Sequence, residues 1–225
     1  EGYIRLLIEE MIPAVARERL AAACDVFCET GVFSLEESRR ILTAAREHGL
    51  AIKVHADQLT PLGGAKLAAE LGALSADHLE RIDEEGVELL AHSGVAAGLL
   101  PIAAHFLRDP RDPPVREMIR RGVICALGTD FNPGSGMCEV MPMAMHLAVI
   151  RFSVSSSEAL WMATAGSARA LDIADRGWIG PGALADLVAW DASGPAMIPY
   201  HFGVNLAAKV FKRGALAAEN GRVIR

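Results

Sequence analysis

Three polar side chains stand at the ends of short apolar segments and could together bind a metal ion. Asp130 follows the apolar run Val123–Leu127, and His55 and His78 lie near the ends of two earlier runs. Two imidazoles and one carboxylate are ligands that suit Zn²⁺ or iron, and a catalytic site of this kind keeps one position open for water. Each residue also has a structural interpretation, because buried histidines often serve packing and an aspartate before a helix often caps it.

The polar segment around Asp130, Gly128–Ser135, is the second feature that could do chemistry. It contains two glycines and begins where a buried strand is expected to end. In α/β proteins the carboxyl ends of strands form the rim where active sites lie. We therefore expect this turn to border a site.

The elements that would position these residues alternate along the chain. Buried strands are expected at Asp25–Glu29, Ala51–Ala56, Leu74–Leu79, Val95–Pro101 and Val123–Asp130. Helical patterns are expected at Tyr3–Ala23, Ser34–His48, Gly63–Leu71, Asp83–His92, Val115–Arg121 and Ser155–Leu171. Five strand-then-helix units with nearly continuous apolar strands indicate an α/β fold with a parallel sheet or barrel. In a barrel the three candidate ligands would converge at the C-terminal mouth.

The composition changes after the last of these helices. Strands are expected at Ala185–Asp191 and Val210–Lys212, and Asn220-Gly221 favours a type I′ hairpin turn. These signals indicate a small antiparallel β unit. We therefore divide the chain into a (β/α) barrel portion, residues 1–175, and a small β-sandwich portion, residues 176–225.

The composition also argues against several partners. The chain has 225 residues, 52% of them hydrophobic, and a formal net charge of −6 without runs of Lys or Arg, which argues against nucleic acid. Its longest apolar stretch, Val95–Leu107, contains Pro101 and His105 and is too short to cross a membrane. The four cysteines lack paired CxxC spacing and are expected to be reduced core residues of a cytoplasmic protein.

Five segments together resemble the imidazolonepropionases, amidohydrolase-superfamily enzymes that open the imidazolone ring in histidine degradation. They are DVFCE (25–29), HADQL (55–59), GALSADHL (72–79), TDFNPGS (129–135) and PYHFGVN (199–205), and they cover almost the whole chain in order. The resemblance implies a TIM-type barrel that hydrolyses the cyclic amide of 4-imidazolone-5-propanoate to N-formimidoyl-L-glutamate. It further implies one Zn²⁺ or Fe ion per active site, a small-molecule substrate and a homodimer.

The resemblance also assigns roles to particular residues. His55 and Asp130 would bind the metal, and His78 would act beside the reacting water as a proton shuttle or electrostatic stabiliser. Either Asp130 or His78 would move the proton to the leaving ring nitrogen. Gln58 would hydrogen-bond the imidazolone ring, at a position where some members of the family carry Glu.

The turn after Asp130 would bind the substrate and product in the same comparison. Asn132 and Gly134 would contact the formimidoylglutamate product, and Ser135 would contact the substrate. A glycine-containing turn can offer backbone N–H groups to a carboxylate, which the propionate of the substrate requires.

The sequence departs from the family pattern in one respect. It contains no His-x-His pair, which the family carries on its first barrel strand, and five βα units are visible where a full (β/α)₈ barrel has eight. We therefore expect a chain that begins after the third strand and is inactive by itself.

Two alternatives remain open at this stage. The first is another amidohydrolase, a cyclic amidase or an aminohydrolase acting on a purine, pyrimidine or triazine ring. Many of those enzymes carry an acid three residues after the strand histidine, where this chain has Gln58. The second is an inactive half-barrel that persists as a folded element.

Overall fold

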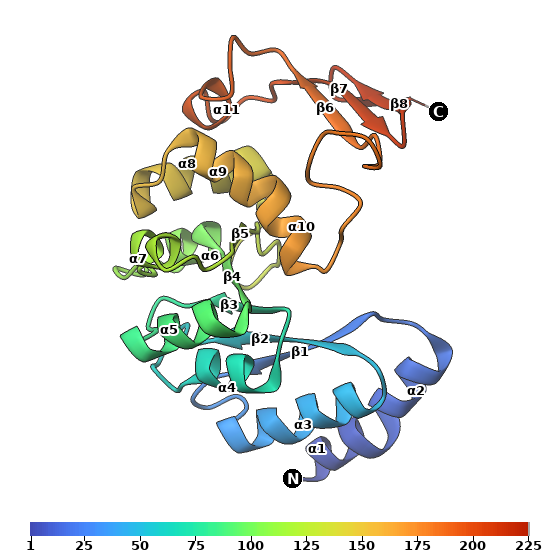
Figure 1. Cartoon of the computed structure of the whole chain (residues 1–225), viewed down its shortest axis with the longest axis vertical. Coiled ribbons are helices and arrows are strands. Elements are labelled where there is room, and N and C mark those ends of the chain that lie inside the picture. Colours follow the sequence, from blue (N-terminus) through green and yellow to red (C-terminus); the bar gives the residue numbers. More distant parts are fainter. Residues whose placement is uncertain (225) are drawn as a thin grey trace. The chain divides into compact units, whose positions relative to one another are not determined.

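The computed structural model describes residues 1–224, which form two compact units (Figure 1). The first unit comprises Glu1–Leu99 and Arg111–Cys125, and the second comprises Leu100–Pro110 and the chain from Ala126 onward. Residue 225 of the predicted β portion lies outside the described residues. No helix in the described part of the chain is long and apolar enough to cross a membrane.

A parallel sheet forms the centre of the first unit. Its strands are β1 (Ala23–Cys28), β2 (Ala51–Ala56), β3 (Ser75–His78) and β4 (Ala96–Leu99). The sheet order follows the chain order, and the fifth strand, β5 (Cys125–Leu127), carries the chain into the second unit. The predicted α/β alternation is therefore confirmed.

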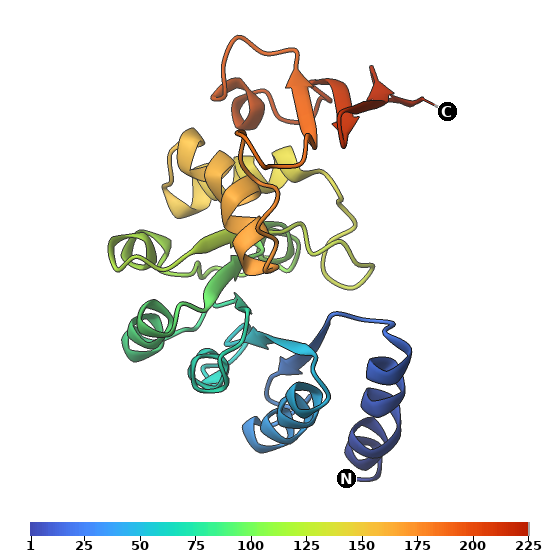
Figure 2. The same cartoon turned by 45° about the vertical axis from the view of Figure 1, so that its right-hand side comes forward.

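Helices connect the strands on one side of this sheet. They are α3 (Leu35–Glu47), α4 (Gly64–Leu71), α5 (Glu84–Ser93) and α7 (Val115–Arg120). In two views α3, α4 and α5 lie on the same face of the strands (Figures 1 and 2). Sequential parallel strands with helices on one face are the arrangement of a (β/α) barrel segment.

The strands are buried against the helices on one face and carry polar side chains on the other. Val54 and Ala76 are fully buried beneath the helices. The register pairs Asp25 with Lys53 and His55 with Asp77. Because side chains alternate along a strand, these four polar residues share the face opposite the helices.

Local sequence signals explain where the helices begin. A capping box is present at α3, where Ser34 caps the helix and the Glu37 side chain accepts a hydrogen bond from the Ser34 backbone N–H. Helix α4 begins at Gly64 because a Cβ there would lie 2.9 Å from the Cα of Ala56. The helix can therefore start directly against the end of β2.

The first helical segment changes its hydrogen bonding just before Pro13. It consists of α1 (Gly2–Leu6), a π-helical turn (Leu7–Met11) and α2 (Ile12–Glu18). Pro13 lies in the first turn of α2. Because Pro13 has no backbone N–H, this segment lacks one hydrogen-bond donor close to the point where the π-helical turn gives way to α2.

The second unit contains helices and a separate antiparallel sheet. Its helices are α6 (Pro101–Phe106), α8 (Met141–Phe152), α9 (Ser156–Trp161), α10 (Ser167–Ala170) and α11 (Met197–Tyr200), with a π-helical turn at Met162–Gly166. Strands β6 (Leu187–Trp190), β7 (Ala207–Lys212), β8 (Ala215–Glu219) and β9 (Arg222–Val223) form the sheet in chain order. Asn220 and Gly221 both have positive φ, 49° and 75°, as the predicted hairpin turn requires.

Three details of the sequence prediction were wrong. Pro101 does not end a strand but begins α6, because proline is well suited to the first turn of a helix. Helices α8 and α11 were missed, since neither has a polar side chain that caps its start. The expected strand Val123–Asp130 is shorter, and Asp130 lies beyond it with a φ of 50°.

Candidate active site

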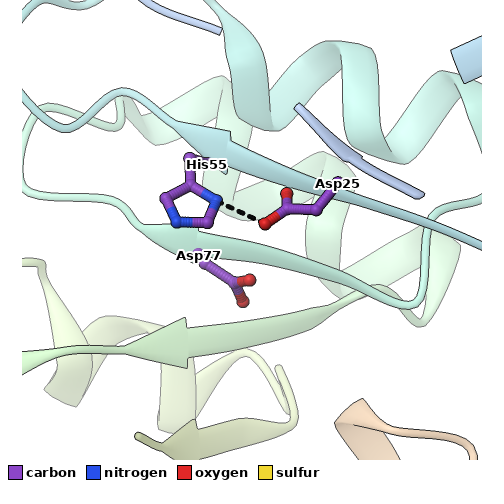
Figure 3. Close-up of side chains that lie close together, drawn as sticks. All are labelled: Asp25, His55 and Asp77. Carbon is purple, nitrogen blue, oxygen red and sulfur yellow. Dashed lines mark ion pairs between the residues drawn. The ribbon is translucent and has the colours of Figure 1, made fainter. Parts of the chain in front are cut away.

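Asp25, His55 and Asp77 lie close together on the polar face of the sheet, one on each of β1, β2 and β3 (Figure 3). Each offers one ligand atom, and these atoms lie within 4.8 Å of one another. Nδ1 of His55 is 2.8 Å from Oδ2 of Asp25. The parallel register produces this cluster, because it places His55 directly beside Asp77.

Asp25 is held in its charged form beside His55. Burial raises the pKa of the Asp25 carboxyl, but the hydrogen bond and charge of His55 and the charge of Lys53 outweigh it, so the pKa is lowered. A carboxylate next to Nδ1 of an imidazole favours the tautomer with its proton on that nitrogen. Nε2 is then the nitrogen of His55 that can bind a cation.

Asp77 has a set of partners of its own. Nζ of Lys53 lies 3.2 Å from Oδ2 of Asp77, and the Ser75 hydroxyl donates to Oδ1 at 2.7 Å. Burial raises the pKa of Asp77, and the Lys53 ammonium opposes that effect. Gly98 on β4 leaves the space that the carboxylate occupies, because a Cβ there would overlap Oδ1 of Asp77.

His78 is a buried, neutral imidazole next to this cluster. Its ring centroid is 5.1 Å from that of His55, and only 1% of the residue is exposed. Burial and the nearby His55 lower the pKa of His78 to about 3, although the charge of Asp25 acts in the opposite direction. Among the described residues Nδ1 of His78 has no hydrogen-bond partner, and Oε2 of Glu80 is 4.0 Å away. A neutral imidazole with an available nitrogen can accept a proton during a reaction.

Gln58 lies in the loop that follows β2, three residues after His55. Only 7% of it is exposed, although it belongs to a loop. The preceding residue, Asp57, has a φ of 50° and caps α4 with its carboxylate. The loop is therefore tied to the helix that follows it.

In the second unit, the Asn132 side chain organises the turn after Asp130. Its Nδ2 donates to the Asp130 carbonyl at 2.8 Å and to Oγ of Ser135 at 2.7 Å. Its Oδ1 accepts the N–H groups of Gly134 and Ser135 at 2.8 and 2.9 Å. The amide thus uses both of its donors and both acceptor positions inside the turn.

The Ser135 hydroxyl completes the turn by donating to Oδ2 of Asp130 at 3.0 Å. The backbone N–H groups expected to bind a substrate carboxylate are therefore engaged by Asn132 in this structure. The turn holds the Asp130 carboxylate beside a hydroxyl group, an arrangement that fixes the orientation of a metal ligand or proton acceptor.

The structure places His55 and His78 side by side and Gln58 in the loop after β2, all in the first unit, and it places Asp130, Asn132, Gly134 and Ser135 in one turn of the second. Sequence reasoning missed Asp25, Asp77 and Lys53. The signal for Asp25 was its place on the same strand face as Phe27, which pairs with His55. One imidazole and two carboxylates are side chains that can hold a divalent cation, and His55 is the member of this cluster that the sequence analysis predicted as a metal ligand.

Comparison with known proteins identifies the family. The model of the Amidohydrolase family matches residues 10–214. The chain belongs to the amidohydrolase family.

Among sequence relatives, it is 48% identical over 218 residues to an imidazolonepropionase from Anaeromyxobacter dehalogenans, covering 97% of this chain and 52% of that protein. An imidazolonepropionase from Treponema denticola is 44% identical over 225 residues, covering 100% and 54%. The chain therefore spans about half the length of the curated relatives it matches.

Solved structures of other proteins share this amidohydrolase fold. An atrazine chlorohydrolase from Arthrobacter aurescens, complexed with zinc, aligns with a TM-score of 0.78 at 18% identity, covering 96% of this chain and 57% of that one. An adenosine deaminase from Xanthomonas campestris, with bound zinc, aligns with a TM-score of 0.75 at 22% identity, covering 90% and 53%. At these identities the likeness shows the fold alone.

Proposed function

We propose that the whole protein to which this chain belongs hydrolyses the cyclic amide of 4-imidazolone-5-propanoate to N-formimidoyl-L-glutamate. The observation that carries the proposal is the pair of histidines, His55 and His78, whose rings lie 5.1 Å apart in a chain 44–48% identical to imidazolonepropionases. An aminohydrolase for purine or triazine rings is less well supported, because Gln58 replaces the acid that many of those enzymes carry.

One Zn²⁺ or Fe ion per site would take part, with His55 and Asp130 as ligands from this chain. Such an ion lowers the pKa of a bound water to ~7 and so supplies a nucleophile at neutral pH. Asp25 would hold His55 in the tautomer that binds the ion. The position of Asp25 beside Nδ1 of His55 fits this role, since a histidine that binds a metal usually donates its other ring N–H to a carboxylate.

The remaining residues would bind the substrate and move protons. His78 would take the proton released by the attacking water and return it to the leaving ring nitrogen, a role supported by its neutral imidazole and by an Nδ1 that has no hydrogen-bond partner among the described residues. Asp130 is the second residue that could carry this proton. Gln58 would hydrogen-bond the imidazolone ring, and the turn of Asn132, Gly134 and Ser135 would face the propionate and the product.

Several further properties belong to the same proposal. The protein would act in histidine degradation in the cytoplasm and form a homodimer. The four cysteines are all free thiols, which agrees with a reducing compartment. Residues 1–175 would form the barrel portion, and residues 176–225 would form part of the small β domain.

The test combines metal content with substrate choice. The whole protein and its Asp130→Asn variant are analysed by elemental mass spectrometry, and each is incubated with 4-imidazolone-5-propanoate, cytosine or guanine. We expect about one zinc or iron per active site, loss of this metal in the variant, and turnover of the imidazolone alone, whereas the chain by itself should be inactive. The control is Asp83→Asn, which removes another carboxylate of the first unit that caps α5.

Each other outcome assigns a different function. Metal binding with turnover of cytosine or guanine would replace imidazolonepropionase with an aminohydrolase. A folded whole protein without metal or turnover would mean that the fold persists as an inactive element. Near-normal turnover of the imidazolone by Asp130→Asn would remove Asp130 from the catalytic machinery.

A further inference from the structure

We propose that Glu29 is a positioning residue that fixes the loop after β2 and thereby sets the place of Gln58. The role of Gln58 in binding the imidazolone ring rests on the proposed function. The contacts of Glu29 with the loop are independent of it. Glu29 follows β1 directly, and Gln58 follows β2, the neighbouring strand.

Both oxygens of the Glu29 carboxylate bind the loop after β2. Oε1 accepts the Thr30 N–H at 2.8 Å and the Thr60 hydroxyl. Oε2 accepts the N–H groups of Leu59 at 2.8 Å and Thr60 at 3.2 Å. The hydroxyls of Thr30 and Thr60 also contact each other at 2.9 Å. One side chain from the end of β1 thus holds two consecutive residues of the next loop.

Burial makes these contacts strong constraints. Only 1% of Glu29 is exposed. A carboxylate withdrawn from water is stable only where hydrogen-bond donors replace its hydration. The Thr60 hydroxyl and the backbone N–H groups supply those donors, and they reverse the effect of burial, so the pKa of Glu29 is lowered. If the loop moved away, it would leave a buried charge without these donors.

The loop is anchored on the other side of Gln58 as well. The Asp57 carboxylate accepts N–H groups at the start of α4, from Gly63 at 2.6 Å and from Ala65 at 2.9 Å. Gln58 therefore stands between a residue fixed to α4 and a residue fixed to Glu29. Its distance from His55 along the chain is three residues, so the same anchors determine where Gln58 lies relative to that histidine.

Glu29 does not act as a proton donor or acceptor in this arrangement. The Glu29 carboxylate accepts all four of these hydrogen bonds, and its pKa is lowered, so it is charged at neutral pH. Glu29 therefore affects the proposed reaction by positioning Gln58, and proton transfer belongs to other residues.

The experiment compares Glu29→Gln with Glu37→Gln. Glu37 is also a glutamate of the first unit with a hydrogen-bonded carboxylate, but it caps α3 through Ser34. The amide of Glu29→Gln presents an NH₂ group to donors, so it cannot replace the carboxylate. We expect amide hydrogen exchange at Leu59 and Thr60 to rise at least ~10-fold in Glu29→Gln, since hydrogen bonds to a charged group are among the strongest in proteins. We expect no change at these amides in Glu37→Gln.

Kinetics distinguishes positioning from a structural role. With imidazolone propanoate, Glu29→Gln should raise KM at a constant metal content. It should also add little to the defect of Gln58→Ala in the double variant, because both changes remove the same contact with the ring. Thr60→Val removes one of the four donors and should give an intermediate rise in exchange.

Two results would overturn the proposal. One is unchanged exchange at Leu59 and Thr60 in Glu29→Gln. The other is increased exchange with parental KM and kcat, in a protein whose Gln58→Ala variant is impaired. If the whole protein has neither metal nor turnover, the proposed function fails, and the exchange at Leu59 and Thr60 alone decides whether Glu29 fixes the loop.

Discussion

Nδ1 of His55 lies 2.8 Å from a carboxylate oxygen of Asp25 on the neighbouring strand. The contact orients the imidazole of His55. We predict that Asp25→Ala retains the fold but weakens zinc binding by ~10–100-fold, the usual effect of losing such an outer partner. Competition with a chromophoric chelator measures the affinity, with His55→Ala as the variant that loses the site. Parental affinity in Asp25→Ala would show that the carboxylate has no role in metal binding.

His78 should separate metal binding from proton transfer. Its ring lies beside that of His55, and burial keeps the imidazole neutral at physiological pH. We predict that His78→Ala keeps the metal and lowers turnover by at least ~100-fold, the scale expected for loss of a proton-transfer group. Elemental analysis and steady-state kinetics on the same sample provide the measurement. Loss of metal from this variant would instead identify His78 as a ligand.

Gly98 should be intolerant of a single methyl group. A Cβ at this position would overlap Oδ1 of Asp77 and lie 2.8 Å from its carboxyl carbon. We predict that Gly98→Ala displaces Asp77 from Ser75 and Lys53, and that it destabilises the protein by about 1–3 kcal/mol, the usual cost of overpacking. Urea denaturation measures this change.

The control for this variant is Gly194→Ala in the second unit, where a Cβ would meet nothing within 4 Å. Gly194→Ala should denature at the parental midpoint. A Gly98→Ala protein as stable as the parent would mean that Asp77 can move without loss.

How far the sequence predicts this site depends on what each signal encodes. The apolar runs and helical patterns are local signals, and they predicted the βα units and the position of His55 near the end of a strand. Asp25 and Asp77 were missed because membership of a strand face depends on register, and a shift by one residue would turn each side chain to the other face. The positive φ of His78, 80°, likewise has no signal in the sequence, since glycine is the usual residue there.

The Asn132 amide shows a different reason for incomplete prediction. The turn was expected to present its N–H groups to a substrate, but the side chain within the turn already binds those of Gly134 and Ser135. An Asn side chain can accept hydrogen bonds from the backbone N–H groups of its own turn. These hydrogen bonds form only when the chain has folded into the turn, so the sequence alone did not reveal them.

Asn132→Asp should therefore disrupt the turn although it changes few atoms. The new carboxylate oxygen would face the Asp130 carbonyl and Oγ of Ser135, to which the amide now donates. We predict faster amide exchange at Gly134 and Ser135 and a loss of turnover of at least ~10-fold, since one lost hydrogen bond with an unsatisfied partner costs ~1–3 kcal/mol.

Asn205→Asp is the matched control for this change. Its Oδ1 accepts the Ala207 N–H, and an aspartate oxygen can do the same. The control should keep parental exchange and turnover. Equal effects of the two substitutions would show that added charge, and not the turn geometry, is responsible.

Glu29 should make the stability of the protein sensitive to acid. Its pKa in the folded protein lies below the value of ~4.3 in an unfolded chain. Below that value the unfolded state binds more protons than the folded state, so the free energy of unfolding falls as pH falls. The contribution of the Glu29 carboxylate to the free energy of unfolding is complete above about pH 4.3. It is lost progressively as the pH drops through the pKa of Glu29 in the folded protein.

The Glu29→Gln variant has no carboxyl group to titrate at this position, and it lacks the hydrogen bonds to a charged carboxylate at every pH. We predict that the variant is less stable than the parent by about 1–3 kcal/mol at pH 7, and that the difference narrows between pH 5 and 3 because the parental carboxylate becomes protonated. Urea denaturation at a series of pH values gives both curves, and Glu88→Gln, at an exposed position on α5, corrects for the lost charge. A constant difference between parent and variant across this range would mean that Glu29 is not held as a carboxylate in the folded protein.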